Sequence, residues 1–203
     1  MKKKKTSAEN TCKRPPFHSL AGQILIAMPG IGMPQFEQTV IYLYAHSQDK
    51  GAAGIIINQP AVGTSFHDVL DELHIAHQNI TNPPPVLIGG PIQVMRGFIL
   101  HSQDYTAHMT IRIGDRFALT ASQDILYDLA CGRGPKHSLL SLGHATWESG
   151  QLEEELADNV WLTATASNDL MFSYPLSQRW SYALKSLGID PACLLSFFGN
   201  RIT

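Results

Sequence analysis

Two adjacent glycines and a proline separate two short apolar runs near the middle of the chain. Val86-Leu87-Ile88 comes before Gly89-Gly90-Pro91, and Phe98-Ile99-Leu100 comes after it. Glycine adopts backbone angles that other residues avoid, and proline fixes its own φ. An apolar run bounded by prolines and glycines is typical of a buried strand. We therefore expect a strand, a tight turn, and a second, central strand with Arg96 and His101 at its two ends.

The rest of the chain shows strand and helix patterns in mixed order. Apolar runs predict strands over 24–27, 38–44, 54–58, 110–113, 117–119, 138–142 and 161–164. A polar turn over 46–50 predicts that two of these strands, 38–44 and 54–58, form an antiparallel hairpin. Helical spacing of apolar residues predicts helices over 66–73, directly after 120–123, over 151–158 and from Pro175 to Gly188.

Several local features accompany these elements. Helix starts are expected at Thr64 or Ser65, at a capping box over 120–123, and at Ser149. A turn is expected over 143–147, and Cys131 is expected to be buried on a helix face. The whole pattern predicts an α/β (α+β) fold, a compact layered domain with a mixed, largely antiparallel β-sheet flanked by helices.

Composition places the chain among globular proteins. It has 203 residues, of which 44% are hydrophobic and 16% are charged. No apolar run is long enough to span a membrane, and the N-terminal lysines are not followed by the apolar segment of a signal peptide. Cys12, Cys131 and Cys193 are widely separated and form no CxxC pattern, so no disulfide framework is expected. We therefore expect a cytoplasmic protein.

Charge is distributed unevenly along the chain. Residues 1–14 carry a net charge of +5, so the formal net charge of -2 leaves -7 on residues 15–203. A short basic run of this kind is typical of a solvated terminus. We expect a disordered basic tail over 1–16 and a single domain over 17–203. Because the body is acidic, direct nucleic-acid binding is expected only through the Lys2–Lys5 tail.

The sequence contains no complete nucleotide-binding, nucleophile or metal-binding motif. The sequence has no GxGxxG, no GxxxxGK[ST] and no GxSxG pattern. His74 and His77 have a spacing that suits a metal, but no third ligand completes the set, so neither a metal site nor a cofactor is expected. The remaining candidates are polar or turn residues near strand ends, which could line a ligand site. They are Asn58, Gly89, Gly90, Arg96, His101 and Trp147.

Two of these candidates have a structural alternative. A histidine at a strand end, such as His101, is more often hydrogen-bonded structure than a functional group. Trp147 could form the wall of a pocket or anchor a partner, and it could equally pack over the edge of the core.

A series of motifs from Gly22 to about Gly199 resembles the bacterial YqgE/AlgH family. The matching segments include Leu25-Ile26-Ala27-Met28-Pro29, Thr39-Val40-Ile41-Tyr42, 51–60, Gly89-Gly90-Pro91, 96–101, 119–126, 142–147, 150–153, 159–162, Arg179-Trp180 and 187–191. The resemblance implies a compact cytoplasmic α/β protein with no established enzymatic activity or cofactor. Some members of that family are named as regulators of transcription, notably of alginate synthesis.

This chain departs from the family pattern at four positions. Met33, Ala45 and Met95 stand where the family usually has Asp, Glu and Asp, and Asn200 stands where it has His. Any charged site built on those positions is weakened here, and Arg96 loses an adjacent acidic candidate partner.

These observations predict a non-enzymatic regulatory or interaction protein of undefined biochemical activity, for which a protein partner is possible and which could affect transcription. The alternative is a small-ligand-binding protein or an enzyme with a site near the Gly89–His101 element. A third hypothesis is direct DNA binding through the Lys2–Lys5 tail. The chain is expected to be a monomer or a weak homodimer.

Overall fold

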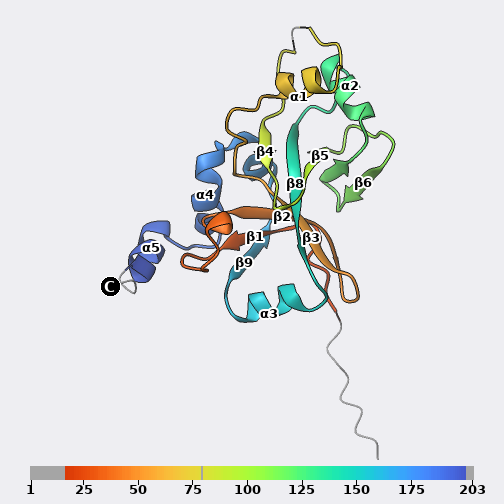
Figure 1. The fold of residues 1–203 in the computed structure, drawn as a ribbon. Coiled ribbons are helices and arrows are strands. Elements are labelled where there is room, and N and C mark those ends of the chain that lie inside the picture. The colour runs from red at the N-terminus through yellow and green to blue at the C-terminus, as the bar shows by residue number, and fades with distance from the viewer. Residues whose placement is uncertain (1–16, 79, 200–203) are drawn as a thin grey trace, which may run out of the picture.

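A computed structural model describes residues 17–78 and 80–199. The predicted disordered tail over 1–16 lies outside the described residues, and the division into a tail and one domain over 17–203 stays a prediction. The described chain is built on a nine-stranded sheet with helices around it (Figure 1). The predicted α+β class, with a largely antiparallel sheet flanked by helices, is confirmed, and the sheet is curled into a half-barrel.

The strands pair in the order β6-β7-β5-β8-β3-β2-β1-β9, with β4 beside β8. Their bounds are β1 Gln23–Ala27, β2 Val40–Ser47, β3 Gly51–Ile56, β4 Val86–Ile88, β5 Ile92–Ser102, β6 Thr110–Ile113, β7 Phe117–Thr120, β8 Ser138–Trp147 and β9 Trp161–Thr165. The predicted hairpin is confirmed, because β2 and β3 pair antiparallel. The parallel pair of β4 with β8 makes the sheet mixed, as expected.

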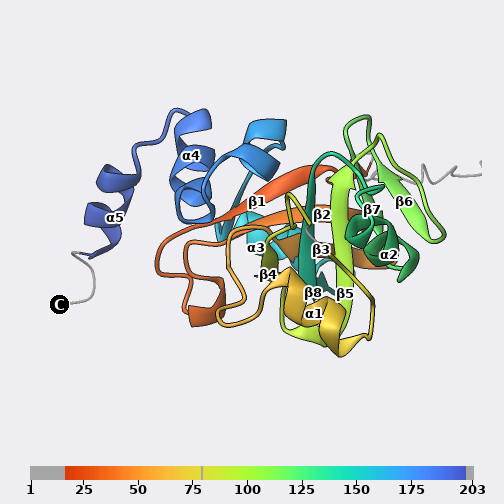
Figure 2. The same ribbon diagram turned by 90° about the horizontal axis from the view of Figure 1, so that it is seen from above.

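Five α-helices lie within the described residues: α1 Phe66–Glu72, α2 Asp124–Ala130, α3 Gln151–Ala157, α4 Arg179–Ser186 and α5 Pro191–Gly199. Short 3-10 helices cover Pro34–Phe36 and Leu176–Gln178, and a π-helix covers Asp169–Ser173. In Figure 2, α1 and α2 lie together beside β5 and β8, whereas α4 and α5 lie at the other end of the molecule.

The sheet separates three apolar cores. The inner core contains Tyr42, Phe98 and Phe117 and is closed by Trp180 of α4. The α3 core packs Leu152 against the two indoles of Trp147 and Trp161. The α1–α2 core packs Phe66 and Leu70 of α1 and Ile125 and Leu129 of α2 against Ile99 and Leu140. Each core covers one face of the sheet or of a helix. The opposite face lies against a second core or against water.

Strand β8 connects the two halves of the sheet. Its first part pairs with β5 antiparallel and with β4 parallel, and its last residues, Ala145 to Trp147, pair antiparallel with β3. The turn predicted over 143–147 is therefore wrong. Gly143 does have a positive φ of 74°, as a turn glycine would, but it produces an irregularity within the strand and the ladder continues beyond it.

The connection between β4 and β5 differs from the expected tight turn. These strands do not pair with each other, because β8 lies between them and hydrogen-bonds both. The Gly89-Gly90 segment crosses the backbone of β8, and the Gly89 N–H donates to the Leu142 carbonyl at 2.8 Å. A Cβ on Gly89 would overlap Ser141 Oγ, and one on Gly90 would overlap the backbone of His144. The glycines are thus needed for close approach of two backbones.

Strand β5 is also longer than expected. It begins at Ile92 and not at Phe98. Its pairing with β8 shifts between Ile92 and Gly97, and residues 93–96 protrude with exposed side chains. The apolar pattern missed this part because an exposed strand segment carries no buried run.

Helix starts agree with the sequence at one place and differ at two. Ser65 caps α1 in a capping box with Asp68, as expected. Gln123 and Gly150 occupy the N-cap positions of α2 and α3 without side-chain caps. The expected capping residues have other partners, since Ser122 Oγ donates to the His108 carbonyl and Ser149 Oγ to the Gln48 carbonyl.

Two further expectations are corrected. Cys131 is exposed, because α2 ends at Ala130 and Cys131 is its C-cap, just beyond the buried helix face. The single long helix predicted from Pro175 is split into a 3-10 turn and α4, and it ends before Gly188, whose φ of 76° stops the helix. Helix α5 follows and was not predicted.

We expect Gly89→Ala to lower the free energy of unfolding by about 3 kcal/mol or more, because its Cβ meets side-chain and backbone atoms of β8. Gly97→Ala is the matched control, since its nearest neighbour is the flexible Leu140 Cδ1 at 3.3 Å. Its cost should be about 1 kcal/mol or less. Neither position has a positive φ. Urea unfolding of both variants measures the difference in the free energy of unfolding. Equal losses of stability in the two variants would contradict the close crossing of the Gly89-Gly90 segment over β8.

Candidate functional site

Three of the six candidate residues, Gly89, Gly90 and Arg96, lie near residues 141–144 in the middle of β8. Gly89 and Gly90 cross its backbone beside Ser141 and His144. Arg96, on the protruding part of β5, lies close enough to His144 for its charge to influence that ring. The other three candidates, Asn58, His101 and Trp147, are engaged in separate contacts.

Asn58 connects two loops. Its Oδ1 accepts a hydrogen bond from the Val40 N–H at 2.8 Å, and its Nδ2 donates to the Gln38 carbonyl at 2.9 Å. The amide therefore fastens the segment after β3 to the start of β2, where Gln38 has a positive φ of 52°.

Trp147 is buried in the α3 core and packs edge-on against Trp161 at 6.1 Å between ring centres. Both indole N–H groups donate to Oε2 of Glu155, at 2.8 Å from Trp147 and 2.6 Å from Trp161. One carboxylate thus satisfies two buried donors. Of the two alternatives for this residue, the contacts are those of a tryptophan packed over the edge of the core.

His101 lies on β5, where this strand pairs with β7, and is fully buried. Its Nδ1 lies 2.8 Å from the Ser102 carbonyl, to which it donates, and its Nε2 lies 2.9 Å from Thr120 Oγ1, from which it accepts. Burial lowers the pKa of His101, and the bond to Ser102 and the charge of Asp104 raise it in part. The ring is therefore neutral and joins two strands.

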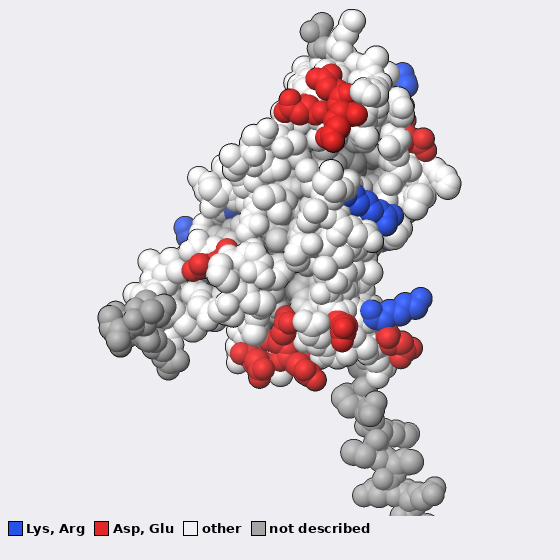
Figure 3. Space-filling view, viewed as in Figure 1, with Lys and Arg blue, Asp and Glu red and all other residues white. Residues whose placement is uncertain are grey.

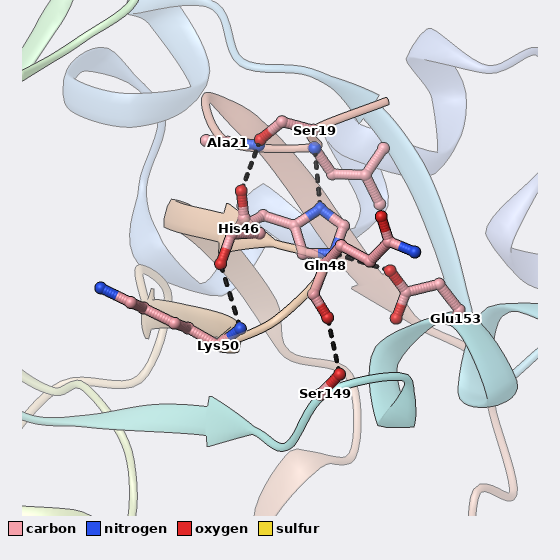
Figure 4. A network of polar contacts seen from close by, with 9 residues as sticks. Ser19, Ala21, His46, Gln48, Lys50, Ser149 and Glu153 are labelled. Carbon is pink, nitrogen blue, oxygen red and sulfur yellow. Dashed lines mark hydrogen bonds and ion pairs between the residues drawn. The ribbon is translucent and has the colours of Figure 1, made fainter. Parts of the chain in front are cut away.

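A second histidine, His46, fastens the segment before β1 to the fold. His46 lies on β2, not in the polar turn expected over 46–50, because the strand extends to Ser47. Its Nδ1 accepts from the Leu20 N–H at 2.9 Å, and its Nε2 lies 2.9 Å from Glu153 Oε1 of α3. Figure 4 shows the ring between the Ser19–Ala21 segment and Glu153, with Ser149 bonded to Gln48 nearby.

The group around Arg96 contains three aromatic rings that sequence reasoning did not bring together. We call Tyr44, Phe98, His144 and Arg96 the Arg96 cluster. Tyr44 Oη lies 2.6 Å from His144 Nδ1, and the Arg96 guanidinium lies 5.1 Å from the centre of the Phe98 ring. Burial raises the pKa of Tyr44 and lowers that of His144, and the charge of Arg96 lowers both. Tyr44 lies on β2, Arg96 and Phe98 on β5, and His144 on β8, so the residues are distant in sequence. Arg96 and His144 lie near the ends of apolar runs, and nothing in the sequence linked them to each other or to Tyr44.

An apolar pocket of about 490 Å³ lies between α1, β5 and α2. We call it the α1–β5–α2 pocket. Its walls include Val69, Leu73, Met95, Gly97, Leu126 and Leu142. Met95 is 86% exposed and Val94 is 53% exposed, so the protruding part of β5 carries apolar side chains at the rim. A concave apolar site of this volume is of the size that binds small ligands or side chains of a partner.

The surface charge is uneven. Acidic side chains gather over the α1–α2 end and over the α3 end in the view of Figure 3. Among residues 17–78 and 80–199, no group of three or more His, Cys, Asp or Glu side chains is arranged to hold a metal ion. Within the same residues, no helix combines the length and the apolar character needed to cross a membrane.

We expect the free energy of unfolding to fall as the pH is lowered from about 7 to about 5, because His101 and His144 are held neutral by the fold. Their folded pKa values lie below the ordinary 6.5, so the unfolded chain binds more protons in this window, and stability rises with pH. Each histidine contributes a slope of at most about 1.4 kcal/mol per pH unit.

His101→Asn should remove one histidine's share of this slope, although the variant is less stable at every pH. The wild-type chain is the reference and should show the full slope. Denaturant unfolding at a series of pH values measures it, and an unchanged slope in His101→Asn would contradict the assignment.

The chain was compared with protein families and with known structures. The sequence profile of a family described as AlgH-like (DUF179) matches residues 24–192. A UPF0301 protein from Jannaschia sp. (strain CCS1) is 46% identical over 185 residues, which cover 90% of this chain and 96% of that protein. A UPF0301 protein from Bradyrhizobium sp. (strain BTAi1) is 45% identical over 189 residues, covering 89% and 87%.

Two solved structures share the fold. The solution structure of the AlgH protein from Pseudomonas aeruginosa superposes with a TM-score of 0.71 at 39% identity, covering 90% of this chain and 96% of that one. A crystal structure from Corynebacterium diphtheriae has a TM-score of 0.68 at 20% identity, covering 89% and 92%, and agrees in fold alone. The family expected from the sequence motifs is confirmed: the chain belongs to the AlgH-like family.

Proposed function

We propose that this chain is a non-enzymatic interaction protein that binds a partner protein at the α1–β5–α2 pocket. The observation that carries the proposal is the exposed apolar rim beside that pocket. Val94 and Met95 lie on a segment of β5 whose residues 93–96 have no ladder partner on β8, and their side chains are exposed. Met95 stands where the family usually has an acid, which makes the rim more apolar in this chain.

Charge around the pocket indicates the chemistry of the partner. Helix α1 carries Asp68, Asp71 and Glu72, and α2 begins with Asp124. Residues 51–95 contain no Lys or Arg. A partner segment with an apolar side chain for the pocket and Lys or Arg on either side of it would complement this surface.

The proposal extends to regulation in the cytoplasm. An effect on transcription would then pass through the protein partner, since residues 15–203 carry a net charge of -7. Cys131 and Cys193 are free and exposed, which suits a compartment that keeps thiols reduced.

A second candidate function is the binding of a small apolar ligand, or catalysis on one, in the same pocket. Its volume of about 490 Å³ favours this candidate, because ligand pockets typically fall in this range. Native mass spectrometry of the purified chain distinguishes the two, since a small ligand of fixed mass would be retained in the gas phase.

A photo-crosslinking amino acid at position 95, introduced in bacterial cells that express the chain, should capture a defined protein. The same group at Leu195, an exposed position on α5, is the control and should not capture it. With the captured protein purified, Met95→Asp should weaken its binding about tenfold or more, because a charge replaces an apolar contact.

Leu195→Asp should bind the captured protein as the wild type does. Met95→Asp should fold normally, because the side chain is 86% exposed. Identical capture from positions 95 and 195, or wild-type affinity of Met95→Asp, would overturn the proposal.

A further inference from the structure

The Arg96 cluster borders the α1–β5–α2 pocket, because Arg96 is itself one of the residues that line the pocket. Phe98, which carries the Arg96 guanidinium on its ring, belongs to the inner core, whereas the next residue, Ile99, belongs to the α1–α2 core. Neighbouring residues of a strand point to opposite faces of a sheet. The Phe98 ring of the cluster therefore lies on the face of β5 opposite to Ile99, whereas Arg96 is shared with the pocket.

Arg96 carries a charge that no acid of the described residues neutralises. The salt bridges among these residues involve other groups, and the described hydrogen bond of Arg96 joins its Nη1 to Gln93 Oε1 at 3.2 Å. The side chain is exposed and its plane is supported by the Phe98 ring. A guanidinium has five N–H donors, so most of them remain available to a ligand.

The Tyr44–His144 pair contributes polar atoms without adding charge. The two rings are nearly parallel, with an angle of 8° between their planes, and the Tyr44 hydroxyl lies 2.6 Å from His144 Nδ1. When Tyr44 donates this bond, the proton of the neutral imidazole sits on Nε2. That nitrogen is buried and has no hydrogen-bond partner among the described residues. A buried donor without a partner is uncommon in a folded protein and indicates a group that the bound state supplies.

We propose that the Arg96 cluster binds a small organic oxyanion, a carboxylate or a phosphate ester, with Arg96 supplying the charge and the Tyr44–His144 pair the neutral hydrogen-bonding groups. A planar guanidinium matches the two oxygens of such a group. The neutral pair leaves the positive charge of Arg96 uncompensated, and the buried Phe98 ring, whose centre lies 5.2 Å from that of His144, supports the guanidinium.

The test uses the full chain labelled with ¹⁵N and follows the imidazole nitrogens of His144 and the Nε of Arg96 by NMR. Phenyl phosphate and benzoate are titrated separately at constant ionic strength, with sodium chloride as the reference. At least one of the two should give saturable shifts at both residues, and the arm that saturates at lower concentration identifies the oxyanion class. Shifts that fail to saturate with either compound, or that chloride reproduces, would refute the site.

Matched variants locate the binding. Arg96→Gln should weaken binding about tenfold or more, as the loss of a charge-assisted hydrogen bond implies. Arg112→Gln, which removes another exposed guanidinium, on β6, should bind as the wild type does. Tyr44→Phe should weaken binding and move the His144 nitrogen signals in the free protein, because Nδ1 loses its partner.

Equal losses in Arg96→Gln and Arg112→Gln would show a general charge effect and overturn the assignment. Spectra of the backbone amides check that each variant is folded. The outcome does not depend on the protein partner, since the titration uses the purified chain alone.

Discussion

The close crossing of two backbones at Gly89-Gly90 and β8 is the constraint on which the other features of this fold depend. Because no side chain separates the two segments, β4 can hydrogen-bond one edge of β8 and β5 the other. Strand β8 then joins β5 to β3 and makes one curled sheet from two halves. The same crossing places the protruding part of β5 beside His144, so both candidate binding regions follow from it.

Local sequence patterns predicted the elements better than their connections. Apolar runs located β1, β4 and β7, and the Ser65–Asp68 capping box located the start of α1, because these signals come from neighbouring residues. The continuation of β8 past Gly143 was missed, since a glycine with a positive φ looks the same in a turn and in a strand irregularity. The crossing of β4 and β5 around β8 depends on residues about 50 positions away, which no local pattern reveals.

The candidate site shows the same limit. Polar residues near strand ends were a reasonable choice, yet the contacts of Asn58 and His101 are those of structural hydrogen bonds. Tyr44 was not chosen, although its hydroxyl bonds a histidine 100 positions away. From the sequence, a tyrosine within a strand is assigned to the hydrophobic core, because no local pattern shows which aromatic ring it will contact. The remaining candidate region is β5 itself, where the Arg96 guanidinium lies at an apolar pocket and over the Phe98 ring.

Trp147 and Trp161, which share the Glu155 carboxylate, make the fluorescence of the protein sensitive to the packing of the α3 core. Both indoles are buried in one core and bonded to one oxygen, while Trp180 is buried in the inner core and donates to the Ala27 carbonyl. Indole emission moves to longer wavelength when water reaches the ring. All three tryptophans of the chain thus respond to loosening of the packing. A Trp180→Phe chain would report on the α3 core alone, without any attached dye.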